Sequence, residues 1–108
     1  MKEENERPWG RYDVVSKTKI IYIDPNKRLS LQLHKHRDEY WTILKGEGEV
    51  QIGEVVYPAK EGDNFHVPKG EKHRVMAGEQ GMSFLEIAVG LVDEDDIVRL
   101  EDDHGRIE

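Results

Sequence analysis

The sequence predicts an all-β protein, a small antiparallel β-barrel, from the spacing of its strand-like segments and its turn residues. Short runs rich in Val, Ile, Leu, Tyr and Thr alternate with turns marked by Gly, Pro and Asn, as in antiparallel sandwiches and barrels. No segment before Val92 has the period of an amphipathic helix. The length of 108 residues and the lack of a linker or an internal repeat indicate one domain over residues 1–108.

Each expected strand ends at a turn signal. Tight hairpins are expected at residues 45–48 and 53–54, where glycines recur, and a further turn at residues 25–26. The acidic tail, residues 93–108, allows either a helical turn or an edge segment. The expected strands are residues 12–15, 18–23, 29–34, 39–44, 49–52, 55–57, 64–67, 73–76 and 83–89.

Composition excludes several functional classes. Sixteen basic and 23 acidic residues give a net charge of −7, which argues against nucleic acid as a partner but permits a small anionic substrate. There is no cysteine, so disulfides and thiolate metal sites are excluded. Residues 1–7 are polar and charged, and no segment is long and apolar enough to cross a bilayer. We therefore expect a cytoplasmic protein without membrane contact.

The first group of candidate metal ligands begins with Gln32 and His34. They alternate with leucines, so both point to the same face of their strand. Glu39 follows His34 after four intervening residues, and Gly46 follows Glu39 after six. A strand that turns back over this distance brings the carboxylate beside the imidazole. Imidazole, carboxylate and amide ligands suit zinc first, with manganese, iron, nickel or cobalt as alternatives.

His36 is an alternative ligand. If His34 and His36 formed the pair, only two residues would separate His36 from Glu39. The spacing therefore favours Gln32 and His34 as ligands and places His36 at the turn near the barrel mouth. The alternative pair stays open because histidine is a commoner metal ligand than glutamine.

The second group ends in His73. Gly62, Pro68, Gly70 and His73 form the pattern G-x5-P-x-G-x2-H. The glycines allow backbone conformations that other residues resist, and the proline restricts the turn. This arrangement places His73 at the start of a strand, facing the same interior as His34. Both groups in this order predict one divalent metal ion held by Gln32, His34, Glu39 and His73.

The two groups resemble the two motifs of the cupin superfamily, with Ala77 in place of the usual final Asn of the second. Longer motifs resemble type II mannose-6-phosphate isomerases, in which the cupin is the C-terminal part of a bifunctional enzyme that is also a mannose-1-phosphate guanylyltransferase. The likeness spans residues 7–106, although His104 stands where that family tends to have Tyr. The matching segments are residues 7–10 (RPWG), 28–32 (RLSLQ), 68–70 (PKG), 72–74 (KHR), 85–87 (LEI), 94–99 (EDDIVR) and 105–106 (GR).

The resemblance implies a double-stranded β-helix, or jelly roll, and a metal-dependent isomerase that interconverts mannose 6-phosphate and fructose 6-phosphate. The guanylyltransferase half has no counterpart in the sequence, so we expect isomerase activity without guanylyl transfer. The alternatives are a non-catalytic sugar-binding or regulatory cupin and a metal-dependent cupin oxygenase.

The same resemblance suggests roles for further residues. His36 and Glu86 are candidate general bases for moving the proton between adjacent sugar carbons, and His66 is a weaker candidate. Arginines suit bidentate contact with a phosphate. Arg74 is the first candidate because it follows His73. The full candidate set for substrate binding is Arg7, Arg28, Arg74, Arg99 and Arg106.

The partners expected are a small sugar phosphate and a second copy of the chain. The leucine face formed by Leu29, Leu31 and Leu33 would need cover in so small a barrel. A homodimer could supply that cover.

Overall fold

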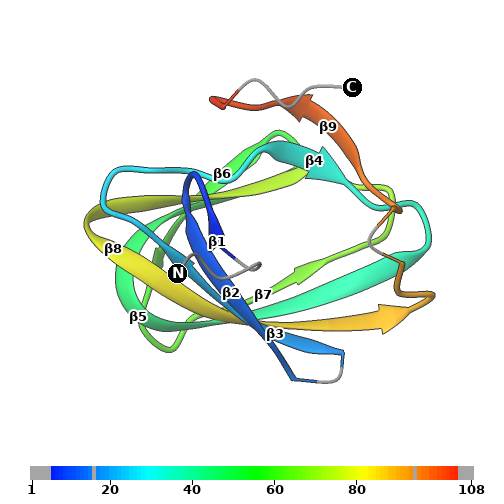
Figure 1. The fold of residues 1–108 in the computed structure, drawn as a ribbon, viewed down its shortest axis with the longest axis horizontal. Coiled ribbons are helices and arrows are strands. Elements are labelled where there is room, and N and C mark those ends of the chain that lie inside the picture. The colour runs from blue at the N-terminus through cyan, green and yellow to red at the C-terminus, as the bar shows by residue number, and fades with distance from the viewer. Residues whose placement is uncertain (1–5, 16, 94, 105–108) are drawn as a thin grey trace.

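The computed structural model describes residues 6–15, 17–93 and 95–104 and contains strands but no helix among them. All nine strands belong to one sheet in which every pairing is antiparallel, and the sheet curls into a barrel (Figure 1). No described helix is long and apolar enough to span a membrane. The predicted all-β antiparallel barrel is confirmed. The strands are β1 (Glu6–Arg7), β2 (Gly10–Val15), β3 (Thr18–Ile23), β4 (Leu31–Leu33), β5 (Arg37–Ile52), β6 (Val55–Lys60), β7 (Asn64–Val67), β8 (His73–Gly90) and β9 (Val98–Glu101).

Two long strands, β5 and β8, run through both halves of the barrel. Near its start β8 pairs with β4 and with the end of β5, and further along it pairs with β3 and with the start of β5. The hairpin expected at residues 45–48 is wrong, because β5 continues through these residues with register shifts and does not reverse. The expected strands 73–76 and 83–89 are likewise parts of the single strand β8.

Glycines allow β5 and β8 to bend against each other. Gly46 has φ 82° and Gly81 has φ 74°. A Cβ atom on Gly46 would lie 2.2 Å from the carbonyl oxygen of Gly81, a severe clash. The glycine pattern that resembles a hairpin therefore serves a bend within a continuous strand.

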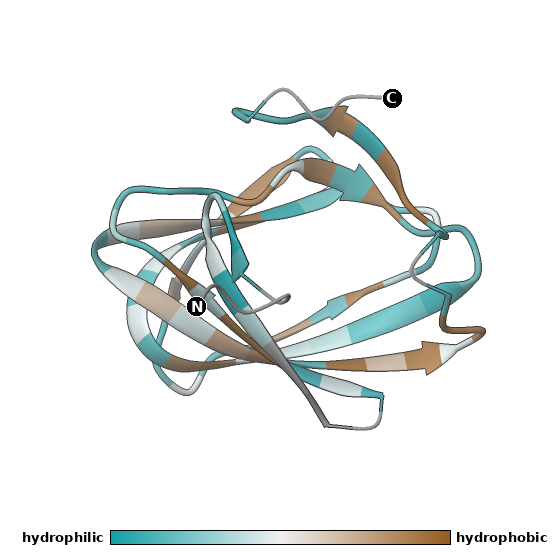
Figure 2. Cartoon of the chain, viewed as in Figure 1, coloured by the Kyte–Doolittle hydropathy of each residue, from teal (hydrophilic) through white to brown (hydrophobic). Residues whose placement is uncertain are grey.

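The core lies inside the barrel, where alternate residues of the strands meet. Ile43 is paired with Phe84, and Val50 is paired with Val75; all four are buried. Figure 2 shows a matching alternation of apolar and polar bands along β7. The apolar residues fill one part of the interior, which leaves the rest to polar side chains.

The strand β9 closes one edge of the sheet beside β4 (Figure 1). The acidic tail thus contains an edge strand, and its segment between residues 95 and 104 has no helical turn. Leu29 and Leu31 are buried within the monomer, and Leu33 is half-buried. The expectation that these leucines need a second subunit is therefore wrong, because the chain itself covers most of their surface.

Candidate metal centre

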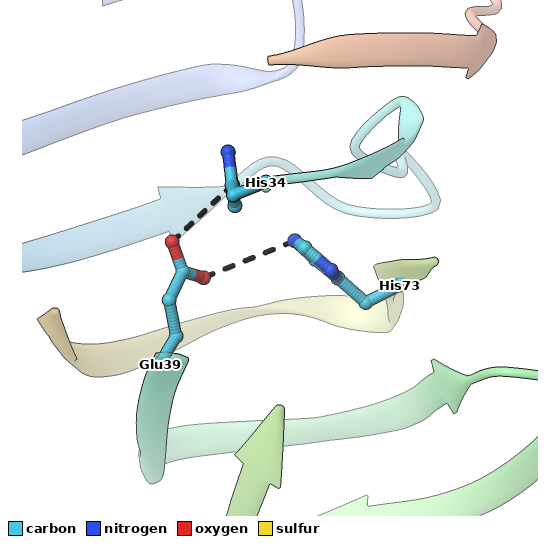
Figure 3. Close-up of side chains that lie close together, drawn as sticks. All are labelled: His34, Glu39 and His73. Carbon is cyan, nitrogen blue, oxygen red and sulfur yellow. Dashed lines mark ion pairs between the residues drawn. The ribbon is translucent and has the colours of Figure 1, made fainter. Parts of the chain in front are cut away.

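Three buried side chains from separate parts of the barrel meet at one point. His34 follows β4 directly, Glu39 lies near the start of β5, and His73 is the first residue of β8. One ligand atom from each lies within 4.8 Å of the others. Figure 3 shows the Glu39 carboxylate between the two imidazoles, with one oxygen toward each ring. The distances are 3.3 Å from Oε2 to Nε2 of His34 and 3.8 Å from Oε1 to Nε2 of His73.

Backbone carbonyls orient both imidazoles. Nδ1 of His34 lies 2.6 Å from the carbonyl oxygen of Asp96, and Nδ1 of His73 lies 3.0 Å from that of Glu71. Each Nδ1 must donate to its carbonyl, so each Nε2 carries a lone pair directed at the centre. Among the described residues, Nε2 of His73 is buried without a hydrogen-bond partner. Such a buried acceptor needs a partner, and a cation would be one.

The electrostatics favour neutral imidazoles beside a charged carboxylate. Burial lowers the pKa of His34 and of His73 by penalising the imidazolium form. Burial alone would raise the pKa of Glu39, but electrostatic attraction by its neighbours His73, His34 and Arg37 outweighs it and holds that pKa below its usual range. Arg37 keeps its positive charge when both imidazoles are neutral, so it still favours the ionised carboxylate. Two neutral nitrogens and one carboxylate form the ligand set of many catalytic zinc sites. The three residues therefore fit a divalent metal ion.

Arg37 lies against the same group. Its Nη2 is 2.9 Å from Oε2 of Glu39 and 3.2 Å from Nε2 of His34, and its Nε is 3.0 Å from the same carboxylate oxygen. If a metal ion bound Glu39 and His34, the carboxylate would contact both the ion and the Arg37 guanidinium. Nη2 of Arg37 would then have to move away from Nε2 of His34. Arg37 was not among our candidate site residues, although it lies between the expected ligands in sequence.

Gln32 lies beside the three residues, and His36 does not. The Gln32 amide is 3.5 Å from Nε2 of His34, and its strand position is directly opposite His73. The amide nitrogen of Gln32 faces His34, and its oxygen accepts a hydrogen bond from the Ser30 hydroxyl. The reversed amide would satisfy Ser30 equally well, because a hydroxyl both donates and accepts. His36 is exposed and lies outside the group that the ligand atoms form.

A cavity of about 140 Å³ opens beside this group. Glu86 lines it next to Glu39, and burial, together with the charge and the hydrogen bond of Glu39, raises the pKa of Glu86 well above its ordinary value. These surroundings favour the protonated form of Glu86. A volume below the roughly 300–1,000 Å³ of drug-sized sites suits a small ligand. The cationic lining residues are Arg7, Lys19, Arg37, Arg74 and Arg99.

Three of the five predicted phosphate-binding arginines line this cavity. Arg74 is buried, donates from Nε to the carbonyl of Leu29 and forms an ion pair of 2.9 Å with Glu101. Its Nη2 has no hydrogen-bond partner within the part of the chain that the structure describes. The other two are Arg7 and Arg99.

The remaining predicted residues lie elsewhere. Arg28 is partly exposed and forms a two-bond ion pair with Asp103 outside the cavity. Arg106 lies outside the described residues. His66 is exposed and contacts Asp38, not the cavity. Spacing could not distinguish these residues, because their direction depends on strand pairing.

Lys19 also lines the cavity and was not predicted. It alternates with Ile21 and Ile23 along β3, and both isoleucines are buried. The two-residue period of the strand therefore places Lys19 on the inward face, and this signal was present in the sequence.

A second, larger hollow of about 660 Å³ lies away from the metal group. Its charged lining residues are Glu47, Glu49, Lys60, Asp63 and Glu79, of which four are acidic. An acidic lining repels phosphate, so the smaller, cationic cavity beside the histidines is the better site for an anionic ligand.

The barrel and its histidine–carboxylate group define a cupin with a candidate metal centre. The chain belongs to the mannose-6-phosphate isomerase C-terminal family, whose pattern matches residues 1–102. The fold is also that of the cupin domain of Cnp3 from Schizosaccharomyces pombe, with a TM-score of 0.71 and 16% identity over 75% of this chain and 64% of that one.

Curated relatives show which longer proteins contain this domain. The chain is 39% identical to the xanthan biosynthesis protein XanB of Xanthomonas campestris over 93% of its length and 23% of that protein. It is 34% identical to the mannose-1-phosphate guanylyltransferase ManC of Salmonella typhimurium over 99% of its length and 24% of that protein. The chain thus spans about a quarter of the length of these relatives.

These relatives correct one expectation. The sequence led us to expect an isomerase that acts without guanylyltransferase activity. Instead, a relative that matches almost the whole chain is named as a guanylyltransferase, and others are named for polysaccharide biosynthesis. The expectation of an isomerase apart from guanylyl transfer is therefore wrong. The family is one of mannose-phosphate enzymes in which this cupin is one part.

Proposed function

We propose that this cupin supplies a metal-dependent sugar-phosphate site to a mannose-phosphate enzyme of the guanylyltransferase type. The reaction that we assign to the site is aldose–ketose isomerisation of the sugar phosphate, as one of two activities of such an enzyme. The observation that carries the proposal is the cationic cavity that opens directly beside His34, Glu39 and His73. Zinc is the first candidate ion, because the set of two imidazoles and one carboxylate is typical of it.

The binding step rests on the arginines and on Lys19. A phosphate in the cavity would meet cationic side chains from different strands, with Arg74 offering its unpartnered Nη2. Guanidinium groups bind phosphate through paired, directed hydrogen bonds. With the phosphate held at the cations, the sugar would extend toward the histidine–carboxylate group.

The chemical step needs a group that carries a proton between two adjacent carbons. A bound metal would supply Lewis-acid stabilisation of the negative charge on the sugar oxygens. Glu86 is the residue that we assign to proton transfer, because it lines the cavity beside the candidate metal ligands and burial raises its pKa well above that of an ordinary carboxyl group. His36, the other candidate base, is exposed outside the cavity lining, so we do not assign the step to it.

The experiment tests the chain as the isomerase part of such an enzyme: it is stripped of metal, loaded with Zn²⁺ and given mannose 6-phosphate, and the formation of fructose 6-phosphate is followed. We expect turnover that a chelator abolishes. We expect Arg74→Met to weaken mannose 6-phosphate binding, measured by calorimetry, about tenfold or more, because a hydrogen bond to a charged group contributes about 1.5–3 kcal/mol.

Arg28→Met is the matched control. Arg28 also pairs with an acidic residue of the tail, but outside the cavity, so binding should stay unchanged. Metal binding without affinity for mannose 6-phosphate would contradict the proposal and indicate a cupin for another ligand. Binding of mannose 6-phosphate without turnover would contradict the assigned reaction and leave a binding domain.

A further inference from the structure

Asp96 connects the segment before β9 to the turn that carries His34. Its carbonyl oxygen lies 2.6 Å from Nδ1 of His34. Its carboxylate accepts two backbone hydrogen bonds, from the nitrogens of Lys35 and His36, each 2.9 Å long. One residue thus holds three consecutive residues of the turn after β4 through both its backbone and its side chain.

The two histidines of the centre differ in how they are oriented. His73 donates to Glu71, only two residues away, so its own turn sets the ring direction. His34 donates to a residue that is 62 positions away in sequence. The direction of its Nε2 therefore depends on a remote segment that could move relative to the turn. The carboxylate of Asp96 restrains that movement by fixing the turn to the segment.

We propose that Asp96 is the positioning residue of the metal centre. By clamping residues 34–36, its carboxylate keeps its own carbonyl on Nδ1 of His34, which holds Nε2 toward Glu39 and His73. The inference rests on the proposed function in one respect, namely that the centre binds a metal ion. Groups that orient a histidine ligand in this way commonly alter metal affinity about 10–100-fold when removed.

The clamp also connects the two parts of the proposed site. The residue after Asp96, Ile97, lines the cavity, and Arg99 in β9 pairs in register with Gln32 of β4. The same short segment therefore orients a metal ligand at one end and presents a cationic side chain at the other. Loss of the clamp should disturb His34 before it disturbs β9, because β9 keeps its own pairing with β4.

Three variants of the full chain test the proposal. Asp96→Ala removes both carboxylate hydrogen bonds, whereas Asp96→Asn keeps one acceptor oxygen. Asp95→Ala is the matched control, because Asp95 is the adjacent aspartate, is exposed and bonds through its backbone nitrogen to Asp93 of its own segment. The Kd for Zn²⁺ is measured by competition with a chromophoric chelator, and the visible spectrum of bound Co²⁺ reports the ligand geometry.

A measurement without metal completes the test. Nitrogen-15 spectra of the histidine rings show which nitrogen of His34 carries the proton. We expect one tautomer, protonated at Nδ1, in the parent chain and a mixture in Asp96→Ala. Zinc affinity should fall about 10–100-fold in Asp96→Ala and less in Asp96→Asn, with a changed Co²⁺ spectrum, while Asp95→Ala matches the parent.

The outcomes separate the proposals. If Asp96→Ala keeps the zinc affinity, the Co²⁺ spectrum and the tautomer of the parent, the positioning role is overturned. If Asp96→Ala does not fold, Asp96→Asn decides by the same readouts. If the parent binds no Zn²⁺ or Co²⁺, the proposed function fails and the positioning role fails with it, whatever the tautomer shows.

Discussion

Gln32 lies directly opposite His73 in the antiparallel pairing of β4 with β8. This pair joins the two halves of the candidate site, because each residue belongs to a different sequence motif. On its other side Gln32 is paired with Arg99 of β9. One residue of a three-residue strand thus lies between a candidate metal ligand and a candidate phosphate ligand.

The position of Gln32 predicts that it contributes to metal binding and that His36 does not. We expect Gln32→Leu to weaken zinc affinity about tenfold, as the loss of a supporting or direct ligand typically does. His36→Ala is the control, because His36 is exposed and lies apart from the group. Chelator competition gives both values. A loss with His36→Ala and none with Gln32→Leu would favour the alternative ligand pair of His34 and His36.

The buried carboxyl group of Glu86 predicts that the free energy of unfolding decreases as the pH rises. In the folded protein, burial and the neighbouring Glu39 raise its pKa well above the ordinary value of a carboxyl group. Above about pH 4.5 the unfolded chain loses this proton while the folded chain keeps it, so the stability that Glu86 contributes is present below that pH and is lost as the pH rises toward the folded pKa. Glu86→Gln removes this loss, because a neutral amide does not ionise.

Urea unfolding of metal-free protein at pH 5 and pH 8 measures the effect. We expect the stability of Glu86→Gln relative to the parent to be greater at pH 8 than at pH 5. Glu79→Gln is the control, since Glu79 is exposed and lines the larger hollow away from the metal group. Equal differences at both pH values would show that Glu86 is ionised in the folded chain.

The Arg74–Glu101 ion pair predicts that the negative charge of Glu101 weakens phosphate binding at Arg74. Glu101 occupies Nη1 of Arg74 at 2.9 Å, and its negative charge lies close to where a phosphate would bind. Because Glu101 is largely exposed, Glu101→Gln should leave the fold intact. It should also strengthen binding of inorganic phosphate severalfold, a change of about 1 kcal/mol or less, since solvent around the exposed Glu101 carboxylate weakens its interaction with the buried Arg74. Calorimetry at low ionic strength measures it, and weaker binding would contradict the placement of the phosphate at Arg74.

The bend where β5 meets β8 predicts unequal effects of two glycine substitutions. Gly46→Ala would force a Cβ atom to within 2.2 Å of a carbonyl oxygen, whereas Gly70→Ala meets nothing within 4 Å. Both glycines have positive φ, 82° and 81°, so both substitutions incur the cost of about 1–2 kcal/mol for that conformation. Only Gly46→Ala adds a clash, and we expect it to lose at least about 3 kcal/mol or to fail to fold. Equal losses by urea unfolding would contradict the close approach.

A homodimer remains a prediction, but we now expect it to form through exposed apolar residues of β5 and β8, not through the leucines near β4. Tyr40 and Ile87 are cross-strand partners on the outside of the barrel, 46% and 42% exposed, and Val89 nearby is 50% exposed. We expect a homodimer that covers these residues, and Ile87→Lys should shift it to monomer in sedimentation. Thr42→Lys, which changes a half-buried residue of the same strand as Tyr40, serves as a comparison. A parent chain that sediments as a monomer at micromolar concentration would contradict the dimer.

Much of the fold could be predicted from local patterns. The bounds expected for residues 18–23 and 64–67 match β3 and β7, because a two-residue alternation and flanking turns define a short strand locally. The same patterns failed at Gly46. In the sequence, a glycine that reverses the chain cannot be told apart from one that only bends a strand. At Gly46 the difference comes from Gly81 of β8, which is distant in sequence and packs against it.

The site divides in the same way. The order and spacing of His34, Glu39 and His73 sufficed to predict that they belong together, because each lies at a fixed distance from a turn in its own motif. The roles of the arginines depended on tertiary structure. No sequence pattern separates Arg28 from Arg74, yet strand pairing places Arg28 at the surface and Arg74 in the cavity lining.

Local periodicity in the sequence thus predicted the barrel, motif spacing grouped His34, Glu39 and His73, and the resemblance of longer motifs indicated the family. Tertiary structure alone decided which cations share the cavity and that Asp96 holds His34. These contacts join residues far apart in the chain. Their distance is set by how the whole sheet curls, which no local pattern records.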